Sequence, residues 1–502
     1  MDKRQESWNI ASSSVFDVAI IGGGINGTCL FHQLAKKGYK VLLVDKGDFA
    51  GGTSQASAMM IWGGLLYLRN LDIPSVFGFS KSRDAMIKDL HPRVSPQSFR
   101  HIPATKGGMN RHFVHFCLYL YWFLGLFNRN APVSQEFFEE ASLLKPPLQS
   151  SSLLYEEAFL KGSDAKFVVN WITTHVNPEN AAINYCSLGG GEFNAREKLW
   201  YLDLTDTLGE HQVTARARYV VNCAGVWTDE INKIFCIKTP FRHIYSKGVF
   251  LGLNRPPEHR VPLIFEMGPN GDALSLVPWG PVSLWGPTET KVESIEDGFR
   301  VMRSDVGFLL DHAERTFNGP VDKSHIVSLR CGIRPLAVKR SFNGNSRSLD
   351  LSRYHRIARA SDVPWISAYG GKITGCITLA DKICAHISGE MMPTRPHKVE
   401  PSVKIQDIEW STFPGLSKRV PSLEWCMENE FCCTIEDYLR RRTNISQWVP
   451  REGLGANNEN LPFIKELALK ISKNNTGKAD KIVGDYTKGV RMRFDRVVQS
   501  GT

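Results

Sequence analysis

The sequence predicts an α/β fold in which a Rossmann-like domain is interrupted by an inserted antiparallel-sheet domain and followed by a C-terminal helical domain. Three observations predict it. A strand, a glycine turn, a helix and a second strand follow one another near the start, two later segments have the same character, and residues of alternating polarity lie between them. At 502 residues the chain is long enough for two or three domains.

The first segment is a compact β-α-β unit. Residues 16–21, "FDVAII", are typical of a buried parallel strand, residues 28–38 of a helix, and residues 39–45, "YKVLLVD", of a second buried strand. The turn after the first strand carries a G-x-G-x-x-G pattern made by Gly22, Gly24 and Gly27. Placed between a strand and a helix, this pattern predicts a dinucleotide site.

Each residue type in this unit has a physical role. Gly22 permits the tight turn, Gly24 lets a pyrophosphate approach the backbone, and Gly27 allows the helix to pack closely on the strand. The helix N-terminus stabilises the negative charge. Asp45, which ends the second strand, accepts hydrogen bonds from ribose hydroxyls. The pattern alone leaves both NAD and FAD open.

Two later segments return the chain to the same sheet. Residues 218–227, "RYVVNCAGVW", are typical of a buried strand that runs into a turn of small residues, and residues 362–387 of a strand, a glycine turn and a helix. The turn "GGKIT" contains Gly371, whose backbone donor could reach the carbonyl side of a flavin ring. This arrangement favours FAD.

The rest of the chain completes the prediction. "HIYSKGVFLGL" and "ALSLVPWGPVSLWG" indicate antiparallel strands of a second sheet. The proline-rich residues 391–402 indicate a linker, and residues 423–443 and 461–473 indicate helices of a C-terminal domain.

The bulk composition excludes some classes of protein. The net charge of +10 favours anionic partners, but the absence of a dense basic run argues against nucleic acid. The 11 cysteines are scattered and form no C-x-x-C pair, so we expect no metal site and no disulfide framework. The polar start, "MDKRQESWNI", does not resemble a secretory signal, and we expect a cytoplasmic protein.

The longest apolar run, Phe113–Phe127, leaves two alternatives open. It is shorter than the ~20 residues that a membrane-spanning helix needs. It could be a buried core helix, or it could lie in the membrane interface, where aromatic residues and the flanking Arg111 and Arg129 are at home. The second alternative would add peripheral contact with the inner face of the membrane.

Eight segments in order resemble the FAD-dependent glycerol-3-phosphate dehydrogenases, within the broader D-amino-acid-oxidase-like flavoproteins. The resemblance covers roughly residues 15–450 and rests on "DVAIIGGGINGT", "TSQASAMMIWGGLLYL", "VVNCAGVWTDEI", "SKGVFLGL", "LVPWGPVSLWGPTET", "GIRPL", "GGKITGCITLAD" and "IEDYLRRRT". It implies an FAD cofactor, a small, anionic or phosphorylated alcohol as substrate, and hydride transfer to flavin N5. Electrons would leave to quinone or oxygen.

The resemblance also assigns residues. Those implied at the cofactor are Thr53, Ser54, Ser57, Ala224, Gly225, Gly371, Lys372 and Thr374. Arg334, in "GIRPL", matches an arginine of the substrate pocket, Lys372 a lysine beside the reacting carbon, and Arg353 another phosphate-binding arginine. Fixed cations of this kind suit a phosphate or a developing oxyanion.

The domain ranges follow from the same comparison of segments. We expect residues 15–90, 200–235 and 355–392 to form the FAD-binding domain, 91–199 and 236–354 the substrate domain, and 403–502 the C-terminal helical domain.

The substrate motifs depart from the family pattern in one direction. Apolar side chains stand where the family has a lysine, a histidine, an arginine and a second histidine, namely Met59, Trp62, Leu66 and Phe250. Tyr67 remains as a polar group of this wall, and we expect it to act with Lys372 and Arg334 in catalysis. The base stays open among Tyr67, Lys372, His243 and a bound water. A changed substrate, glycerol 3-phosphate with substituted contacts, and flavin binding without catalysis are the three alternatives.

Overall fold

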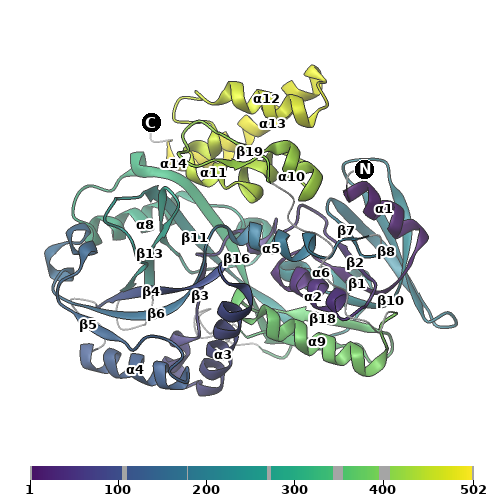
Figure 1. Ribbon diagram of the computed structural model, residues 1–502, viewed down its shortest axis with the longest axis horizontal. Helices are drawn as coiled ribbons and strands as arrows, with labels where there is room; N and C mark the ends of the chain where they lie inside the picture. The colour runs from purple at the N-terminus through teal and green to yellow at the C-terminus, as the bar shows by residue number, and fades with distance from the viewer. Residues whose placement is uncertain are drawn as a thin grey trace.

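Two large β-sheets lie side by side at the centre of the molecule (Figure 1). The computed structural model describes residues 3–103, 110–177, 179–267, 273–342, 354–394 and 408–499. Within these ranges sheet A has eight strands and sheet B has ten, and a third sheet has two. One cluster of buried apolar side chains runs from sheet A into sheet B, so the two sheets share a core.

Sheet A is the predicted Rossmann-like sheet. Its parallel strands are ordered β18, β10, β1, β2 and β7. Antiparallel β17 pairs with β18, β9 pairs with the first half of β10, and β8 pairs with β9. The strands are β1 (Val15–Ile21), β2 (Val41–Val44), β7 (Ala181–Ile183), β8 (Cys186–Asn194), β9 (Leu199–Asp206), β10 (Gln212–Asn222), β17 (Arg356–Arg359) and β18 (Trp365–Tyr369). The apolar runs of β1 and β2 are buried, as both faces of a parallel sheet require.

Helices cover both faces of sheet A. The helices near it are α1 (Lys3–Ser13), α2 (Ile25–Lys36), α5 (Asp164–Thr173), α6 (Thr228–Ile234) and α9 (Cys376–Glu390). Helix α2 buries Leu30, Phe31 and Leu34, which lie on one face, and packs against α5 and α9. Helix α1 packs Trp8 and Ala11 against the opposite face.

Strand pairing puts residues 181–194 in sheet A, although the sequence assigned them to the inserted domain. Strand β7 pairs in parallel with β2, and β8 pairs with β9. The glycines of "SLGGGEFN" weaken the strand pattern of β8, so its place could not be read from the residues. The domain boundaries otherwise stay a prediction.

Sheet B is the inserted sheet. Its strands are antiparallel except for the parallel pair β4 and β12. The strands are β3 (Met60–Ile61), β4 (Val94–Ile102), β5 (Val133–Gln135), β6 (Ser152–Leu160), β11 (Phe241–Asn254), β12 (Leu263–Glu266), β13 (Ala273–Trp279), β14 (Val282–Gly286), β15 (Thr290–Val292) and β16 (Ile326–Lys339). The accompanying helices are α3 (Ile73–Leu90), α4 (Arg111–Leu124), α7 (Ile295–Gly298) and α8 (Arg303–Thr316).

The predicted C-terminal helices lie along one side of the molecule, above sheet B and α5 in the view of Figure 1. They comprise α10 (Leu423–Asn429), the π-helical turn η9 (Asp437–Arg442), α11 (Ile445–Trp448), α12 (Leu461–Ile471), α13 (Thr476–Val490), the π-helical turn η11 (Arg491–Asp495) and α14 (Arg496–Val498). The small hairpin of β19 (Trp410–Ser411) and β20 (Val420–Pro421) precedes them. Most of the expected linker, residues 395–402, lies outside the described residues.

Most of the apolar run Phe113–Phe127 forms helix α4, which is buried on one face only. Val114, Leu118 and Tyr121 are buried on one face, whereas Phe116 and Phe123 are 62% and 58% exposed on the other. The helix is therefore not wholly buried, and its exposed face is apolar rather than polar. Among the described residues, no helix has the length and apolar character to cross a bilayer. Arg129, which flanks the run and would lie in the membrane interface on the second alternative, pairs with Asp84 and Glu156.

Candidate functional site

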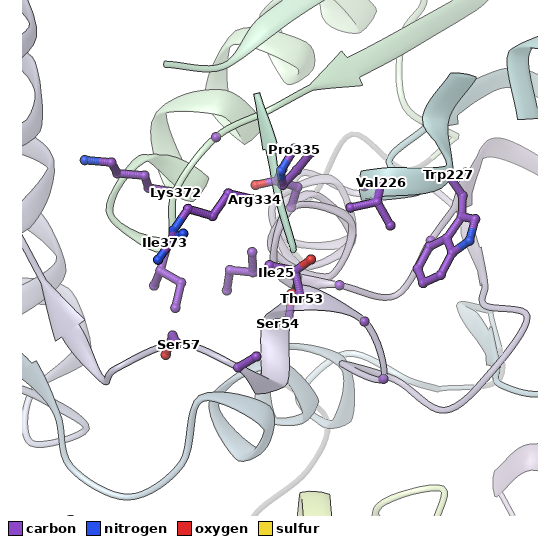
Figure 2. Close-up of a pocket in the computed structure, with 18 of the residues that line it drawn as sticks. Ile25, Thr53, Ser54, Ser57, Val226, Trp227, Arg334, Pro335, Lys372 and Ile373 are labelled. Atoms are coloured by element: carbon purple, nitrogen blue, oxygen red, sulfur yellow. Dashed lines mark hydrogen bonds between the residues drawn. The ribbon is translucent and has the colours of Figure 1, made fainter. Parts of the chain in front are cut away.

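A cavity of about 1100 Å³ begins at the carboxyl ends of β1, β2 and β10 and continues to sheet B. Parallel sheets bind ligands at this edge. Most of the predicted site residues line it: Gly22, Gly24, Asp45, Thr53, Ser54, Ser57, Trp62, Ala224, Gly225, Phe250, Arg334, Gly371, Lys372 and Thr374. Figure 2 shows side chains from four distant segments around the hollow, among them Ser54, Trp227, Arg334 and Lys372.

The glycine turn has the expected form. Gly22 has a φ of 106°, and a Cβ there would lie 2.5 Å from the carbonyl oxygen of Cys223. A Cβ on Gly27 would lie 1.9 Å from the carbonyl oxygen of Gly22, so α2 can pack this closely on the turn only without a side chain. Gly27 therefore acts in packing and is not itself part of the cavity wall.

Asp45 is held from two sides. Its Oδ2 accepts a hydrogen bond from the Gly23 amide at 2.6 Å, and its Oδ1 accepts one from the Gly47 amide at 2.9 Å. Burial raises the pKa of Asp45 to about 6, and these two hydrogen bonds oppose that rise. The carboxylate is thus fixed at the cavity wall, where the remaining acceptor capacity of its oxygens suits ribose hydroxyls.

Thr53 and Ser54 join α2 to sheet B. The Ser54 hydroxyl oxygen accepts a hydrogen bond from the Ile25 amide at 2.9 Å, in the first turn of α2. The Thr53 hydroxyl donates to the carbonyl of Ile333 on β16 at 2.7 Å. Because Gly24, Ile25 and Ser54 all line the cavity, the positive end of α2 faces it and favours an anion.

A buried ion pair fixes the backbone of Ser57. Arg330 Nη2 lies 2.5 Å from Asp164 Oδ2, and the two side chains hold the segment from both sides. Arg330 Nε donates to the Ser57 carbonyl at 2.7 Å, while the Ser57 amide donates to Asp164 Oδ2 at 2.8 Å. The position of Ser57 at the cavity therefore depends on β16 and α5.

The second glycine turn rests on His243. Gly371 has a φ of 102°, a conformation that favours glycine. The Gly370 amide donates to His243 Nε2 at 3.1 Å, and Asn26 donates to the Gly370 carbonyl at 3.2 Å. Burial lowers the pKa of His243 to about 3. Because its Nε2 is occupied and its ring is not among the lining residues, His243 supports the turn and cannot be the base considered from the sequence.

Arg334 reaches the cavity paired with an acid. Its Nη1 lies 2.8 Å from Glu289 Oε2 and 3.4 Å from the Ser246 hydroxyl, which itself donates to Glu289. A Cβ on Gly248 would lie 2.5 Å from Arg334 Nη2, so a glycine there leaves room for the guanidinium. The positive charge that the sequence predicted here is thus balanced by a carboxylate.

Lys372 lines the cavity, but its ammonium packs on aromatic rings. Lys372 Nζ lies 4.5 Å from the ring centroid of Tyr67 and 5.1 Å from that of Phe79. The side chain extends away from the Arg334 guanidinium in Figure 2. Tyr67 itself stacks on Phe79 and is not among the lining residues described. The predicted cooperation of Tyr67 with substrate would therefore act through Lys372.

Trp62 and Phe250 form the apolar wall that the sequence predicted. Both line the cavity, and Phe250 is almost fully buried. Trp62 Nε1 is buried with no hydrogen-bond partner among the described residues, and the Trp62 carbonyl accepts a hydrogen bond from Thr374 at 3.2 Å. Leu66 belongs to the 3-10 helix η2 (Leu65–Asn70), but its side chain lies outside the described part of the chain, as does the whole of Arg353.

Several lining residues escaped the sequence analysis. Lys46 Nζ lies 3.9 Å from the ring centroid of Trp227, and both residues line the cavity. Glu436 and Arg441, from η9 in the C-terminal part, also line it. The segment "IEDYLRRRT" could have drawn attention to them, since three consecutive arginines next to acids favour ion pairing.

None of the 11 cysteines, which all lie within the described ranges, forms a disulfide. In the described ranges, no cluster of three or more His, Cys, Asp and Glu side chains could hold a metal ion.

The donor groups fit an extended dinucleotide. The N-terminus of α2 suits a pyrophosphate, Asp45 suits a ribose, and the Gly371 turn could bring backbone groups to a ring system. At about 1100 Å³ the cavity lies just above the range of about 300–1,000 Å³ usual for ligand pockets, which suits a ligand as large as a dinucleotide.

Comparison with known proteins agrees with this fit. The chain is 27% identical over 410 residues to glycerol-3-phosphate dehydrogenase 2 of Mycobacterium tuberculosis, covering 80% of this chain and 67% of that protein. It is 26% identical over 399 residues to the aerobic glycerol-3-phosphate dehydrogenase of Staphylococcus aureus, covering 77% and 69%.

Solved structures share the fold. The glycerol-3-phosphate dehydrogenase from Bacillus halodurans complexed with FAD has a TM-score of 0.72 at 17% identity, covering 100% of this chain and 99% of that one. The L-α-glycerophosphate oxidase from Mycoplasma pneumoniae with FAD bound has a TM-score of 0.57 at 12% identity, covering 77% and 97%.

The family model for the FAD-dependent oxidoreductases known as DAO matches residues 17–375, which include the glycine turn, the apolar wall and Arg334. The predicted fold and the predicted FAD cofactor are therefore confirmed. This chain belongs to the DAO family of FAD-dependent oxidoreductases.

Proposed function

We propose that this chain oxidises a small alcohol, removing a hydride from the carbon that carries the hydroxyl group. One observation carries the proposal: a single cavity extends from the N-terminus of α2 to a chamber bounded by Trp62, Phe250 and Arg334. FAD, when bound, supplies a two-electron acceptor whose N5 takes the hydride. The chain's own contribution is to orient the alcohol carbon, because hydride transfer depends steeply on position.

The lining of the chamber supports a substrate with one anionic group and an apolar or planar part. Arg334 favours an anion, but Glu289 at 2.8 Å would repel the second charge of a phosphate. Trp62 and Phe250 favour an apolar surface. Glycerol 3-phosphate itself is the second candidate, supported by the identity to glycerol-3-phosphate dehydrogenases.

The hydroxyl proton needs an acceptor at the same time. Glu289, a bound water, or Lys372 in its neutral amine form beside Tyr67 can serve, since Lys372 and Glu289 line the cavity. Arg334 would then offset negative charge that develops on the substrate oxygen.

The apolar face of α4 supports peripheral contact with a membrane. We define this α4 patch as the exposed aromatic residues Phe113, Phe116, Tyr119 and Phe123. Aromatic side chains on one helix face insert favourably into a lipid interface. We propose quinone in that membrane, or oxygen, as the electron acceptor.

Anaerobic reduction of the bound flavin tests the proposed function. Purified protein should be yellow, and its flavin absorption should bleach with at least one member of a panel of hydroxy acids, neutral alcohols and sn-glycerol 3-phosphate. Faster bleaching by a singly charged hydroxy acid supports the proposal, whereas faster bleaching by glycerol 3-phosphate supports the second candidate. Flavin that no alcohol reduces, together with bleaching by dithionite, would overturn the proposal in favour of flavin binding without catalysis.

A further inference from the structure

Three consecutive arginines of η9 contact the segment that carries the cofactor-binding residues. We call residues 45–57 the cofactor loop. Arg440 Nη2 donates to the Gln55 carbonyl at 3.1 Å, and Arg441 Nε donates to Asp48 Oδ2 at 2.5 Å. Arg442 uses both terminal nitrogens, with Nη1 2.8 Å from Asp48 Oδ2 and Nη2 2.8 Å from Asp48 Oδ1. The C-terminal part thus binds, through hydrogen bonds and ion pairs, a loop almost 400 positions earlier in the chain.

Asp48 and its two arginines are shielded from water. Asp48, Arg441 and Arg442 are each no more than 4% exposed. Burial alone would raise the pKa of Asp48, but Arg442 and Arg441 hold it below the ordinary value. A buried carboxylate in two ion pairs has a sharply defined position, because moving it would leave charges unpaired.

A second set of contacts connects η9 to the cofactor loop through Tyr185. Arg441 Nη2 also lies 2.6 Å from Asp437 Oδ1, which accepts a hydrogen bond from the Tyr185 hydroxyl at 2.5 Å. The Tyr185 amide in turn donates to the Gly47 carbonyl at 2.8 Å. Burial, followed by the nearby Asp48 carboxylate, raises the pKa of Asp437. The network therefore reaches the loop at both Gly47 and Asp48.

The same residues form part of the cavity wall. Asp48, Tyr185 and Arg441 line the same cavity as Asp45. Asp45 lies three positions from Asp48, and Ser54 closes the same loop against α2. A shift of Asp48 would therefore move the groups that meet the cofactor.

We propose that Arg441 and Arg442 are positioning residues for FAD, which act by fixing the cofactor loop through Asp48. The C-terminal helices thereby complete the FAD site of this chain. The inference rests on the cofactor and is independent of the substrate, so the flavin-reduction experiment can fail without affecting it.

The test measures FAD affinity in the full-length protein. FAD is removed, and its dissociation constant is determined by flavin fluorescence for the wild type, Arg441→Lys and Arg442→Lys. Lysine keeps the charge, but it cannot make the two-pronged contact of Arg442 with Asp48 or the simultaneous contacts of Arg441 with Asp48 and Asp437. Each variant should bind FAD about tenfold more weakly or worse, as expected for a lost charged hydrogen bond.

Arg451→Lys is the matched control. Arg451 makes an equally good two-pronged pair with Asp495, at 2.8 Å for both contacts, but within the C-terminal part and away from the loop. Its substitution should lower thermal stability while leaving FAD affinity unchanged. Gln55→Ala is a milder variant in case a lysine variant does not fold, because it keeps both arginines and removes the Gln55 Oε1 acceptor of Arg441 Nη1 together with the hydrogen bond from Gln55 Nε2 to the Gly51 carbonyl. It should weaken FAD binding severalfold.

Three results would overturn the proposal. The first is wild-type FAD affinity in folded Arg441→Lys and Arg442→Lys proteins. The second is wild-type affinity in Gln55→Ala when neither lysine variant folds. The third is an equal loss in Arg451→Lys, because such a loss would show a general effect of C-terminal stability on the cofactor site.

Discussion

The side chains of Arg334 and Glu289 form an ion pair across β11. Arg334 lies in β16 and Glu289 directly precedes β15, and these two strands pair with β11 on opposite sides. Strand β16 places Arg334 opposite Ser246, and β15, which begins directly after Glu289, places Lys291 opposite the same residue. The Ser246 hydroxyl bridges the two side chains. The charge of the substrate chamber is therefore set by this pair rather than by Arg334 alone.

Replacing Glu289 with glutamine should strengthen the binding of small anions. The change keeps the size and a hydrogen-bond acceptor but removes the charge that balances Arg334. We expect about tenfold tighter binding of phosphate or a small carboxylate, which corresponds to about 1.4 kcal/mol. Perturbation of the flavin spectrum by titrated anion measures it. Glu293→Gln, in an exposed pair with Lys291, is the control, and equal anion affinities for all three proteins would contradict the role given to Glu289.

Replacing Phe250 with histidine should raise the rate of flavin reduction by glycerol 3-phosphate. Phe250 lines the chamber at the position where the resembled dehydrogenases carry a histidine, and a well-placed base contributes about 10²–10⁴ in rate. Stopped-flow reduction under anaerobic conditions measures the effect. Phe250→Leu also removes the ring but adds no proton acceptor, so an equal rise in both variants would refute the explanation by base catalysis.

Acid should destabilise the protein through its buried histidines. Burial lowers the pKa of His243 to about 3 and of His175 to about 4, from 6.5. Below pH 6.5 the unfolded chain takes up protons that the folded chain does not, so the free energy of unfolding falls as pH drops towards 4. Above pH 6.5 these groups contribute no pH dependence.

The variant His243→Gln isolates the contribution of His243 to this pH dependence, since the glutamine oxygen can still accept the hydrogen bond from the Gly370 amide. Between pH 5.5 and 4, the free energy of unfolding should fall by about 1.4 kcal/mol less per pH unit in the variant than in the wild type. Urea unfolding at several pH values measures this difference. The exposed His112→Gln serves as control, and a wild-type slope in His243→Gln would contradict the assignment.

Serine at Phe116 and Phe123 should abolish binding to vesicles that contain anionic phospholipid. Both side chains are largely exposed, so the double variant should fold and melt like the wild type. Vesicle flotation measures binding. Phe463→Ser changes an exposed phenylalanine on α12, far from α4 in Figure 1, and should float as the wild type does. If the double variant floats with vesicles as the wild type does, the α4 patch does not mediate membrane binding.

Local backbone requirements were the part of the site that the sequence predicted best. Gly22 and Gly27 are needed for the turn itself, because Gly22 has a φ of 106° and a Cβ on Gly27 would lie 1.9 Å from the carbonyl oxygen of Gly22. The same holds for Gly371. Alternating residues likewise predicted the antiparallel pairing of β11, β13 and β14.

Long-range pairing was the part that could not be predicted. Glu289 reaches Arg334 only because of the register of three strands, and His243 proved to support a turn rather than face the cavity. Tyr67 was expected on the wall, but its place depends on how η2 stacks against Phe79. Such contacts follow from tertiary packing, which residue spacing does not encode.

The distance along the chain between Asp48 and Arg442 has a consequence for the order of events during synthesis. A ribosome makes the glycine turn and the cofactor loop early, but η9 emerges nearly 400 residues later. At about 5–20 residues per second, the loop waits about 20–80 seconds for its arginines. If Arg441 and Arg442 fix the cofactor loop as proposed, FAD binding is completed only after the C-terminal helices have folded.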